Sequence, residues 1–506
     1  MVSRSTGTSI SIQILNNDSL LSIFYLCRPD IFDKSEYGSI WWGNWIRERW
    51  WYNLVQVCRR WRHLILGSAS HLGLCLVCGR ATPVADMLAH SPPLPLIIDH
   101  DYENDELAAK DEEGVILALQ HHDRVCRINL KMPALSLQKL ITALDRKFPM
   151  LEYLYIAPPT KHDRNIKLIL PPAFEAPQLR LIILNHFTPP IEAPLLATSM
   201  GISTLALRWI RPSAYLHPND LLQPLSLLHN LETLEIGFFY PVPIREIERQ
   251  LSHTPTIACA IFPNLQWFSF WGISNYLEAL LPHMTAPVLE RFRVHFFNQQ
   301  GFSVPHLLQF MENTSNLKFR SIRILFYHKA VAVFVGARVE TVIEDFFMQI
   351  LCRHLDWQVY SMAQIFHTLS PLLSSVEELN LDYRAHTLSS EGHNEVDYTL
   401  WCKLLRSCRS IETLRVHRYL VEDISRSLNS DGDSNTELLP ELRELIYPMG
   451  SVGDKTFATF VHEHELAGNP VKLIRERSPA DPEIYFFYSS ESTSMYTVNS
   501  DPTLPR

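Results

Sequence analysis

A spaced apolar motif that recurs along the chain limits the possible folds more than any other feature. The motif is apolar-x-x-apolar-x-apolar, and its eleven copies begin at Val125, Leu151, Leu179, Ile202, Leu231, Leu265, Leu289, Phe319, Val376, Ile411 and Leu442. The spacing averages about 29 residues if one degenerate copy lies between Phe346 and Cys352, which is typical of a repeat architecture. The last two apolar residues of each copy lie two apart, so they face the same side of a short strand.

The stretches between these copies have helical apolar spacing. Examples are Leu135–Phe148, Asp220–His229, Leu277–His283 and Trp357–Leu373. One strand and one helix per repeat stack into a solenoid with a continuous core and strands along a concave face. We therefore predict an α/β solenoid, an irregular leucine-rich-repeat-like horseshoe, over residues 125–465. A different α/β arrangement of the same strands and helices is the alternative.

The composition indicates a globular protein that does not bind nucleic acid or membranes. Hydrophobic residues make up 46% of the 506 residues, and the formal net charge of −9 repels phosphate backbones. The nine cysteines lack the density and spacing of a secreted disulfide framework, and residues 1–11 lack the apolar centre of a secretion signal. No run of 18 apolar residues occurs. We expect a soluble protein of the cytoplasm, the nucleus or both.

A segment of different character precedes the repeats. Asn16, Asn17 and Asp18 are residue types that cap helix N-termini, and they stand directly before an apolar face at Leu20, Ile23, Phe24 and Cys27. A second helix is predicted over residues 51–66, because Leu54, Val57, Cys58, Trp61 and Ile65 recur at helical spacing. The sequence thus predicts a small all-α module over residues 13–70.

The two halves of this module resemble the F-box motif. The first half is Leu15-x-x-Asp18-x-Leu20-Leu21-x-Ile23-Phe24, and the second contains Val57-Cys58-Arg59-Arg60-Trp61-Arg62 followed by Leu64-Ile65. The sharp motifs cover only Leu15 to Ile65, but the layout as a whole is similar to fungal F-box proteins with divergent leucine-rich repeats.

The chain departs from the F-box pattern in two places. Asn16 stands where the motif usually has proline, and the residue 29–50 insertion separates the halves. The insertion carries four tryptophans, namely Trp41, Trp42, Trp45 and Trp50. These aromatic residues either bury the insertion against the module or form an additional contact surface for a partner.

The resemblance implies that the module docks on the Skp-family adaptor of a cullin–RING ubiquitin ligase. The residues it implies for this contact are Leu15, Leu20, Leu21, Phe24, Leu54, Val55, Cys58, Trp61 and Leu64. A unit of this size cannot bury all of its apolar residues, so we expect some in its core and others in an exposed patch. The repeats would then bind a protein substrate and hold it near a charged ubiquitin-conjugating enzyme, without a catalytic group or cofactor from this chain.

The outward strand positions of the repeats are the candidate substrate-binding surface. The residues singled out there are Trp267, Trp271, Arg291, Arg293, His295 and Arg323. Aromatic and basic side chains together suit a peptide, and arginine suits an acidic or phosphorylated one. A merely solvated face is the alternative interpretation.

The motifs of common enzymes and metal sites are missing. Cys75-x-x-Cys78 has metal-ligand spacing but no second pair, so we expect it to lie in a buried strand or strand-like packing. His462-Glu463-His464-Glu465 lacks the spacing of a zinc protease. We therefore predict no enzymatic activity and no metal.

The remaining segments are expected to be a disordered N-terminus over residues 1–12, a connection over 71–124, and a C-terminal segment over 466–506 that ends in a disordered tail. The competing functional hypothesis is a leucine-rich-repeat scaffold whose N-terminal helices pack on the first repeat and never meet an adaptor.

Overall fold

The structure, a computed structural model, describes twelve stretches of the chain. They are residues 15–28, 48–101, 109–158, 168–189, 194–211, 215–239, 259–299, 301–336, 345–384, 396–429, 438–449 and 456–476. The expectations for residues 1–12, for most of the 29–50 insertion with Trp41, Trp42 and Trp45, and for the tail after residue 476 lie outside the described residues.

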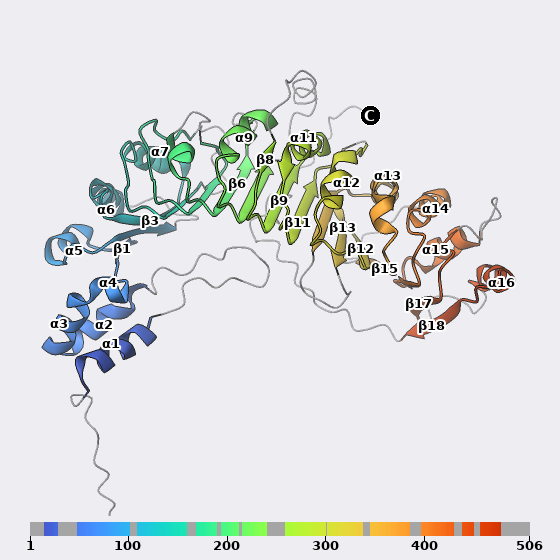
Figure 1. Ribbon diagram of the computed structural model, residues 1–506, viewed down its shortest axis with the longest axis horizontal. Coiled ribbons are helices and arrows are strands. Elements are labelled where there is room, and N and C mark those ends of the chain that lie inside the picture. Colours follow the sequence, from blue (N-terminus) through green and yellow to red (C-terminus); the bar gives the residue numbers. More distant parts are fainter. Residues whose placement is uncertain are drawn as a thin grey trace, which may run out of the picture. The chain divides into compact units, whose positions relative to one another are not determined.

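Within the described residues, sixteen strands form one mostly parallel sheet in which strands alternate with helices (Figure 1). The spatial order is β1-β2-β3-β4-β5-β6-β7-β9-β11-β14-β13-β12-β15-β16-β17-β18. The strand bounds are β1 Leu76–Gly79, β2 Leu96–Asp101, β3 Val125–Lys131, β4 Tyr153–Ala157, β5 Leu181–Asn185, β6 Thr204–Ile210, β7 Thr233–Phe238, β9 Trp267–Gly272, β11 Arg291–Phe296, β12 Ser321–Tyr327, β13 Ala330–Gly336, β14 Phe346–Leu351, β15 Glu378–Arg384, β16 Thr413–Val416, β17 Glu444–Pro448 and β18 Lys472–Glu476. Strands β8 Ala260–Ile261 and β10 Met284–Thr285 pair separately. The predicted α/β, leucine-rich-repeat-like solenoid is confirmed.

Helices follow the strands along most of the chain. Their bounds are α1 Asn17–Leu26, α2 Trp50–Val57, α3 Arg59–Gly67, α4 Ala69–Leu72, α5 Val84–His90, α6 Ala109–Gln120, α7 Ala134–Thr142, α8 Pro194–Thr198, α9 Pro218–Leu225, α11 Ser274–Leu280, η4 Leu281–His283, α12 Pro305–Glu312, α13 Leu355–Leu373, α14 Tyr398–Arg406, α15 Val421–Leu428 and α16 Ala458–Leu466. In the part of the chain that the structure describes, none of these helices is both long and apolar enough to cross a bilayer.

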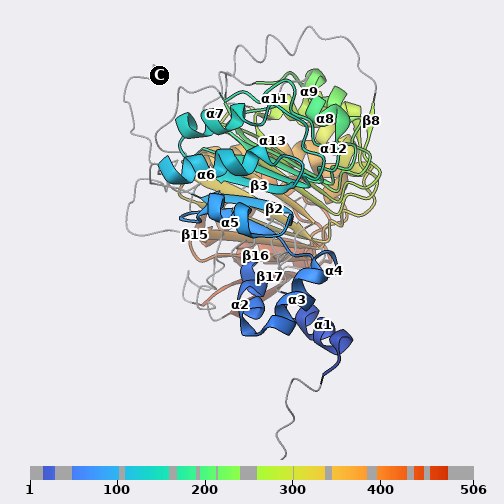
Figure 2. The same cartoon turned by 90° about the vertical axis from the view of Figure 1, so that its left-hand side faces the viewer.

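The chain divides into two compact units, which are described separately. The first comprises residues 1–182 and 192–199, and the second comprises residues 183–191 and 200–506. In the first unit, Figure 2 shows α5 and α6 beside strands β2 and β3. In the second, α9, α11 and α12 lie along one face of the sheet (Figure 1).

The sheet begins earlier than the sequence predicted. Residues 71–124 were expected to connect the helical module to the repeats, but they contain β1 and β2, which pair in parallel with each other and then with β3. Cys75 and Cys78 are buried at the start of this sheet, as expected. At the other end, β18 extends the sheet beyond residue 465 to Glu476.

The expected degenerate repeat copy is a strand, but it occupies a different place in the sheet. Strand β14 covers Phe346–Leu351 and pairs in parallel with β11, whereas β12 pairs in parallel with β15. Strand β13 lies between them and is antiparallel to both β12 and β14. After β11 the chain therefore leaves two strand positions empty and forms β12. It then fills those positions with β13 and β14, which brings it back beside β11, and the 19-residue helix α13 leads from there to β15 on the far side of β12.

Alternation along the strands decides which side chains meet the helices. The rings of Phe268 and Phe292 on neighbouring strands stack 5.2 Å apart, and the ring of Phe310 on α12 meets Phe292 at 5.5 Å. All three side chains are buried. Residues at the alternate positions of β9 and β11 therefore point to the sheet face opposite these helices.

The N-terminal segment forms the predicted helical module, with one difference. Helix α1 begins as expected, with the Asn16 side chain accepting a hydrogen bond from the backbone N–H of Ser19 at 2.8 Å. The predicted helix over 51–66 is instead two helices, because Cys58 is extended, with φ of −158° and ψ of 168°. The Cys58 thiol then accepts a hydrogen bond from the N–H of Trp61 and caps α3.

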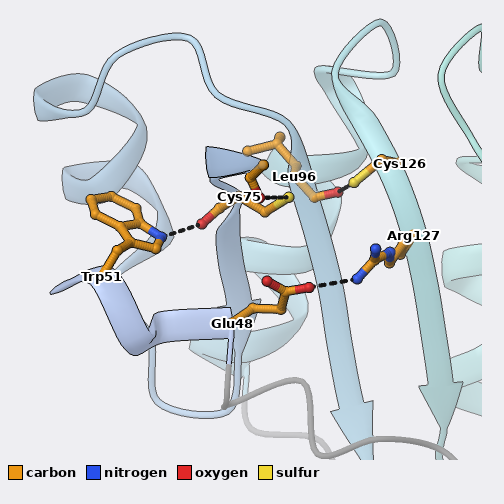
Figure 3. Close-up of polar contacts among 7 residues, drawn as sticks. Glu48, Trp51, Cys75, Leu96, Cys126 and Arg127 are labelled. Carbon is orange, nitrogen blue, oxygen red and sulfur yellow. Dashed lines mark hydrogen bonds and ion pairs between the residues drawn. The ribbon is translucent and has the colours of Figure 1, made fainter. Parts of the chain in front are cut away.

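The helical module is anchored directly on the first strands of the first unit (Figure 3). Glu48 and Arg127 of β3 form an ion pair at 2.8 Å, with side-chain exposures of 1% and 13%. The Trp51 indole donates to the Cys75 carbonyl at 3.2 Å, and Arg49 donates to the Val77 carbonyl of β1 at 3.2 Å. The start of α2 and the residues before it thus cover the beginning of the sheet.

We expect the Glu48→Gln substitution to destabilise the first unit by about 3–5 kcal/mol. The substitution keeps the size of the side chain but removes the negative charge that pairs with the buried guanidinium of Arg127. Urea unfolding monitored by tryptophan fluorescence measures the change.

The matched control is Glu377→Gln. Glu377 pairs with Arg320 at 2.8 Å, but the side chains are 50% and 65% exposed, so the loss should be at most about 1 kcal/mol. Equal losses in the two variants would show that burial of the Glu48–Arg127 pair has no special weight.

Candidate functional site

The outward residues singled out from β9 and β11 lie together on the sheet face opposite the helices. The strand register places Arg291 beside Trp267 and His295 beside Trp271. Arg293 is paired with Ser269 between them. The structure thus brings five of the six predicted substrate-binding residues into one cluster in the second unit.

The two arginines of this cluster stack on aromatic rings. The guanidinium of Arg293 lies 4.7 Å from the ring centre of Trp267 and 5.8 Å from that of Phe347 on β14. Arg291 lies 5.5 Å from Trp267. Cation–π contacts contribute about 0.5–2 kcal/mol each. The two guanidiniums are therefore held beside the Trp267 ring.

His295 is held by a hydrogen-bonded chain. Its ring lies 4.1 Å from the Trp271 ring, and its Nδ1 lies 2.8 Å from the Oε1 of Gln349. The Gln349 Nε2 in turn donates to the hydroxyl of Tyr327. Burial lowers the pKa of His295 to about 3, so the ring is neutral at physiological pH. With Nδ1 donating to Gln349, the Nε2 of His295 is a hydrogen-bond acceptor.

Arg323, the sixth predicted residue, does not join this cluster. Strands β13 and β14 separate its strand, β12, from β11. Arg323 forms an ion pair with Asp382 on the neighbouring β15 at 2.5 Å. The sequence could not reveal this separation, because the placement of β13 and β14 between β11 and β12 changes the order of the strands.

Three residues of the cluster were missed from the sequence. Phe347 and Gln349 were missed because the position of β14 beside β11 has no sequence signal. Trp209 was missed because β6 contains a bulge between Leu207 and Ile210 that interrupts the alternation. The ring of Trp209 meets that of Trp271 at 5.1 Å, nearly perpendicular.

The residues implied for adaptor binding divide into core and surface. Leu20 and Phe24 are buried in the module, where Phe24 meets the Trp61 ring at 4.9 Å. They therefore contribute no contact area to a partner. The others are half-buried or, for Cys58, exposed: Leu15, Leu21, Leu54, Val55, Cys58, Trp61 and Leu64.

The most exposed large apolar residues of the module were not among those predicted for the contact. They are Ile23, Tyr25 and Leu26 of α1 and Val57 of α2. Leu26 is 82% exposed and Val57 is 60% exposed. Ile23 and Leu26 lie three residues apart, so they are neighbours on the surface of α1.

The two halves of the F-box-like motif meet in space. Arg60 donates to the carbonyl of Leu15 at 2.6 Å and to the Asn17 side chain at 2.9 Å.

Among the residues that the structure describes, no group of three histidine, cysteine or acidic side chains is arranged to hold a metal ion. Burial raises the pKa of the Cys78 thiol to about 12, so this cysteine is held as a neutral thiol.

Comparison with known proteins gives no assignment. No protein-family model matches the chain, and no curated protein is similar to it at a significant level.

We expect acid to destabilise the second unit through His186 and His295. Burial lowers the pKa of both His186 and His295 to about 3, whereas an unfolded histidine titrates near 6.5. Below pH 6.5 the unfolded chain therefore binds protons that the folded chain does not. As the pH is lowered, the free energy of unfolding decreases by up to about 1.4 kcal/mol per pH unit for each histidine. The His295→Gln variant should lose about 2 kcal/mol less than the unaltered chain between pH 7 and pH 5.

Urea unfolding at the two pH values measures this difference. Half-buried Glu278 and Asp345 of the same unit have raised pKa values and act in the opposite direction, but they are common to both proteins and cancel in the comparison. The control is His367→Gln, which alters an exposed histidine of α13. A pH response of His295→Gln identical to that of the control would contradict the prediction.

Proposed function

We propose that the protein is a non-catalytic substrate receptor of a cullin–RING ubiquitin ligase. The helical module would dock on the Skp-family adaptor, and the solenoid would hold a protein substrate. The observation that carries the proposal is the joining of the two F-box-like half-motifs by Arg60, which bonds to Leu15 and Asn17. An arginine of the most specific part of the motif thus has a definite role in assembling the module.

The surface of the module supports a docking role. Its core is built from Leu20, Phe24 and other buried residues, yet Leu26 and Val57 expose most of their apolar surface. Apolar residues left at the surface after the core is complete are the usual material of a protein contact. In this proposal the adaptor covers Ile23 and Leu26 on α1 together with Val57 on α2.

The proposed mechanism is proximity. The adaptor connects the receptor to the cullin and RING subunits, and substrate held on the solenoid acquires a high effective concentration beside the ubiquitin-conjugating enzyme. A rigid receptor makes this more effective, and the Glu48–Arg127 pair with the Trp51 and Arg49 hydrogen bonds provides rigidity between the module and the first strands. The proposal requires no cofactor and a cytoplasmic or nuclear location.

A scaffold without ligase function is the second candidate. The packing of the module on β1 fits it, because a terminal repeat needs a cap whether or not an adaptor is present, but a receptor would pack in the same way. The two candidates differ in what they require of the exposed residues on α1 and α2. A cap needs only the side of the module that meets β1.

We expect the intact chain to co-purify with a Skp-family adaptor in equal amounts. The double substitution Ile23→Glu, Leu26→Glu should abolish the complex, because it places two charges at an apolar contact while leaving the buried Leu20 and Phe24 in place. Val57→Glu should weaken it. Size-exclusion chromatography of the co-expressed proteins measures the outcome.

The control is Leu135→Glu, since Leu135 on α7 is also an exposed leucine, at 68%. It should leave the complex intact. A well-folded chain that forms no adaptor complex would refute the receptor proposal and leave the scaffold. Equal binding by the double variant would refute the α1 contact.

A further inference from the structure

Three aromatic rings form a continuous row on the sheet face opposite the helices. Trp209 meets Trp271 at 5.1 Å, and Trp271 meets His295 at 4.1 Å. Strand β7 lies between β6 and β9, and it places Gly237 beside Trp271. A Cβ atom at Gly237 would lie 3.6 Å from the Cβ of Trp271. The two indoles meet because the strand between them carries no side chain at this point.

Trp209 reaches this row through a strained backbone. Its φ is +57°, a left-handed conformation that costs a tryptophan about 1–3 kcal/mol. The strain coincides with the bulge between Leu207 and Ile210, and bulges redirect side chains at functional sites. The strained residue thus serves to place its ring on this face of the sheet, away from the helices.

The cluster beside the ring row is positively charged. The outward positions of β9, β11 and β14, as far as the structure describes them, contain two arginines and no carboxylate. On the next strand, β7, Glu235 lies beside Ser269 and forms an ion pair with Arg208 at 2.6 Å. His295 is neutral, so Arg291 and Arg293 supply the charge. The carboxyl group of Asp345, just before β14, is influenced by the charge of Arg291 and offsets part of it.

We infer that this face binds an extended acidic segment of a protein. A carboxylate of the segment accepts charge-assisted hydrogen bonds from the guanidiniums of Arg291 and Arg293, because the planar fork of N–H donors of arginine matches a carboxylate. An apolar or aromatic side chain of the segment rests on Trp209, Trp271 and His295. The assignment of this segment to a ubiquitylation substrate rests on the proposed function.

The strand geometry gives the expected spacing of the segment. Arg293 and His295 lie two residues apart on the parallel strand β11, which is about 6.6 Å. An extended peptide that runs along the strand has the same distance between alternate side chains. The segment should therefore carry its acidic residue and its apolar or aromatic residue with one residue between them.

Selection of a random dodecapeptide phage library on the full chain tests the inference. We expect enrichment of aspartate or glutamate two positions from an aromatic or large apolar residue. A synthetic peptide from the selection should lose about ten- to hundredfold in affinity to the Arg293→Glu variant, because it loses a charge-assisted hydrogen bond. Raising the salt concentration should also weaken binding.

Two further variants keep the test decisive. Arg409→Glu makes the same charge change at an exposed site after α14 and should leave peptide affinity unchanged. Arg291→Glu replaces Arg293→Glu if the latter fails to fold. Selected peptides without acidic enrichment, or equal losses in Arg409→Glu and Arg293→Glu, would overturn the inference.

The ring row has its own variant. Gly237→Val inserts a branched side chain between Trp209 and Trp271 and should remove the aromatic preference while preserving the acidic one. Unchanged aromatic preference would overturn the role of the rings. If the chain selects acidic peptides but binds no adaptor, this inference is supported and the ligase function is refuted. Failure of the inference and failure of the proposed function are therefore distinguishable.

Discussion

In-register pairing of parallel strands is the constraint on which the rest of the structure depends. In the first unit it places Ile128 beside Leu154, and in the second it places Leu234 beside Phe268, which in turn lies beside Phe292. These rows meet the helices and form the core. Because side chains alternate along a strand, the same register collects the remaining residues on the opposite face. A slip of one residue would exchange the two faces, so the core and the candidate site are determined together.

The first strand of the sheet creates a second constraint. A sheet edge exposes unpaired backbone groups that invite aggregation, and repeat proteins cover such ends with a cap. Here the Val77 carbonyl accepts from Arg49 and the Cys75 carbonyl accepts from Trp51. The helical module therefore has a structural role that it would keep without any partner. Its packing on β1 is expected of both a receptor and a scaffold, and only the exposed side of α1 and α2 separates them.

Sequence reasoning found the features that repeat with a simple period. The eleven motif copies located eleven of the strands after residue 125, though not β13 or β18, and alternation identified Arg291, Arg293 and His295 as neighbours on one face. The apolar run from Leu74 to Cys78 was expected to be buried strand or strand-like packing, and it contains β1, but its place at the start of the sheet was not predicted because it lacks the spaced motif. Trp209 was missed because a bulge interrupts alternation. The separation of Arg323 from the cluster depends on strand order, which periodicity does not encode.

The insertion of β13 and β14 between β11 and β12, which we call the antiparallel insertion, also explains the character of the candidate site. In a simple repeat array β12 would lie next to β11 and bring Arg323 close to Arg293, with guanidiniums on neighbouring strands repelling each other. The insertion moves β12 three strand spacings away from β11, about 14 Å, where Arg323 pairs with Asp382. Strand β14 takes its place and supplies the ring of Phe347 to Arg293 and the amide of Gln349 to His295. The antiparallel insertion thus places the ring of Phe347, rather than the guanidinium of Arg323, beside Arg293. This allows Arg291 and Arg293 to remain close together on a half-buried face.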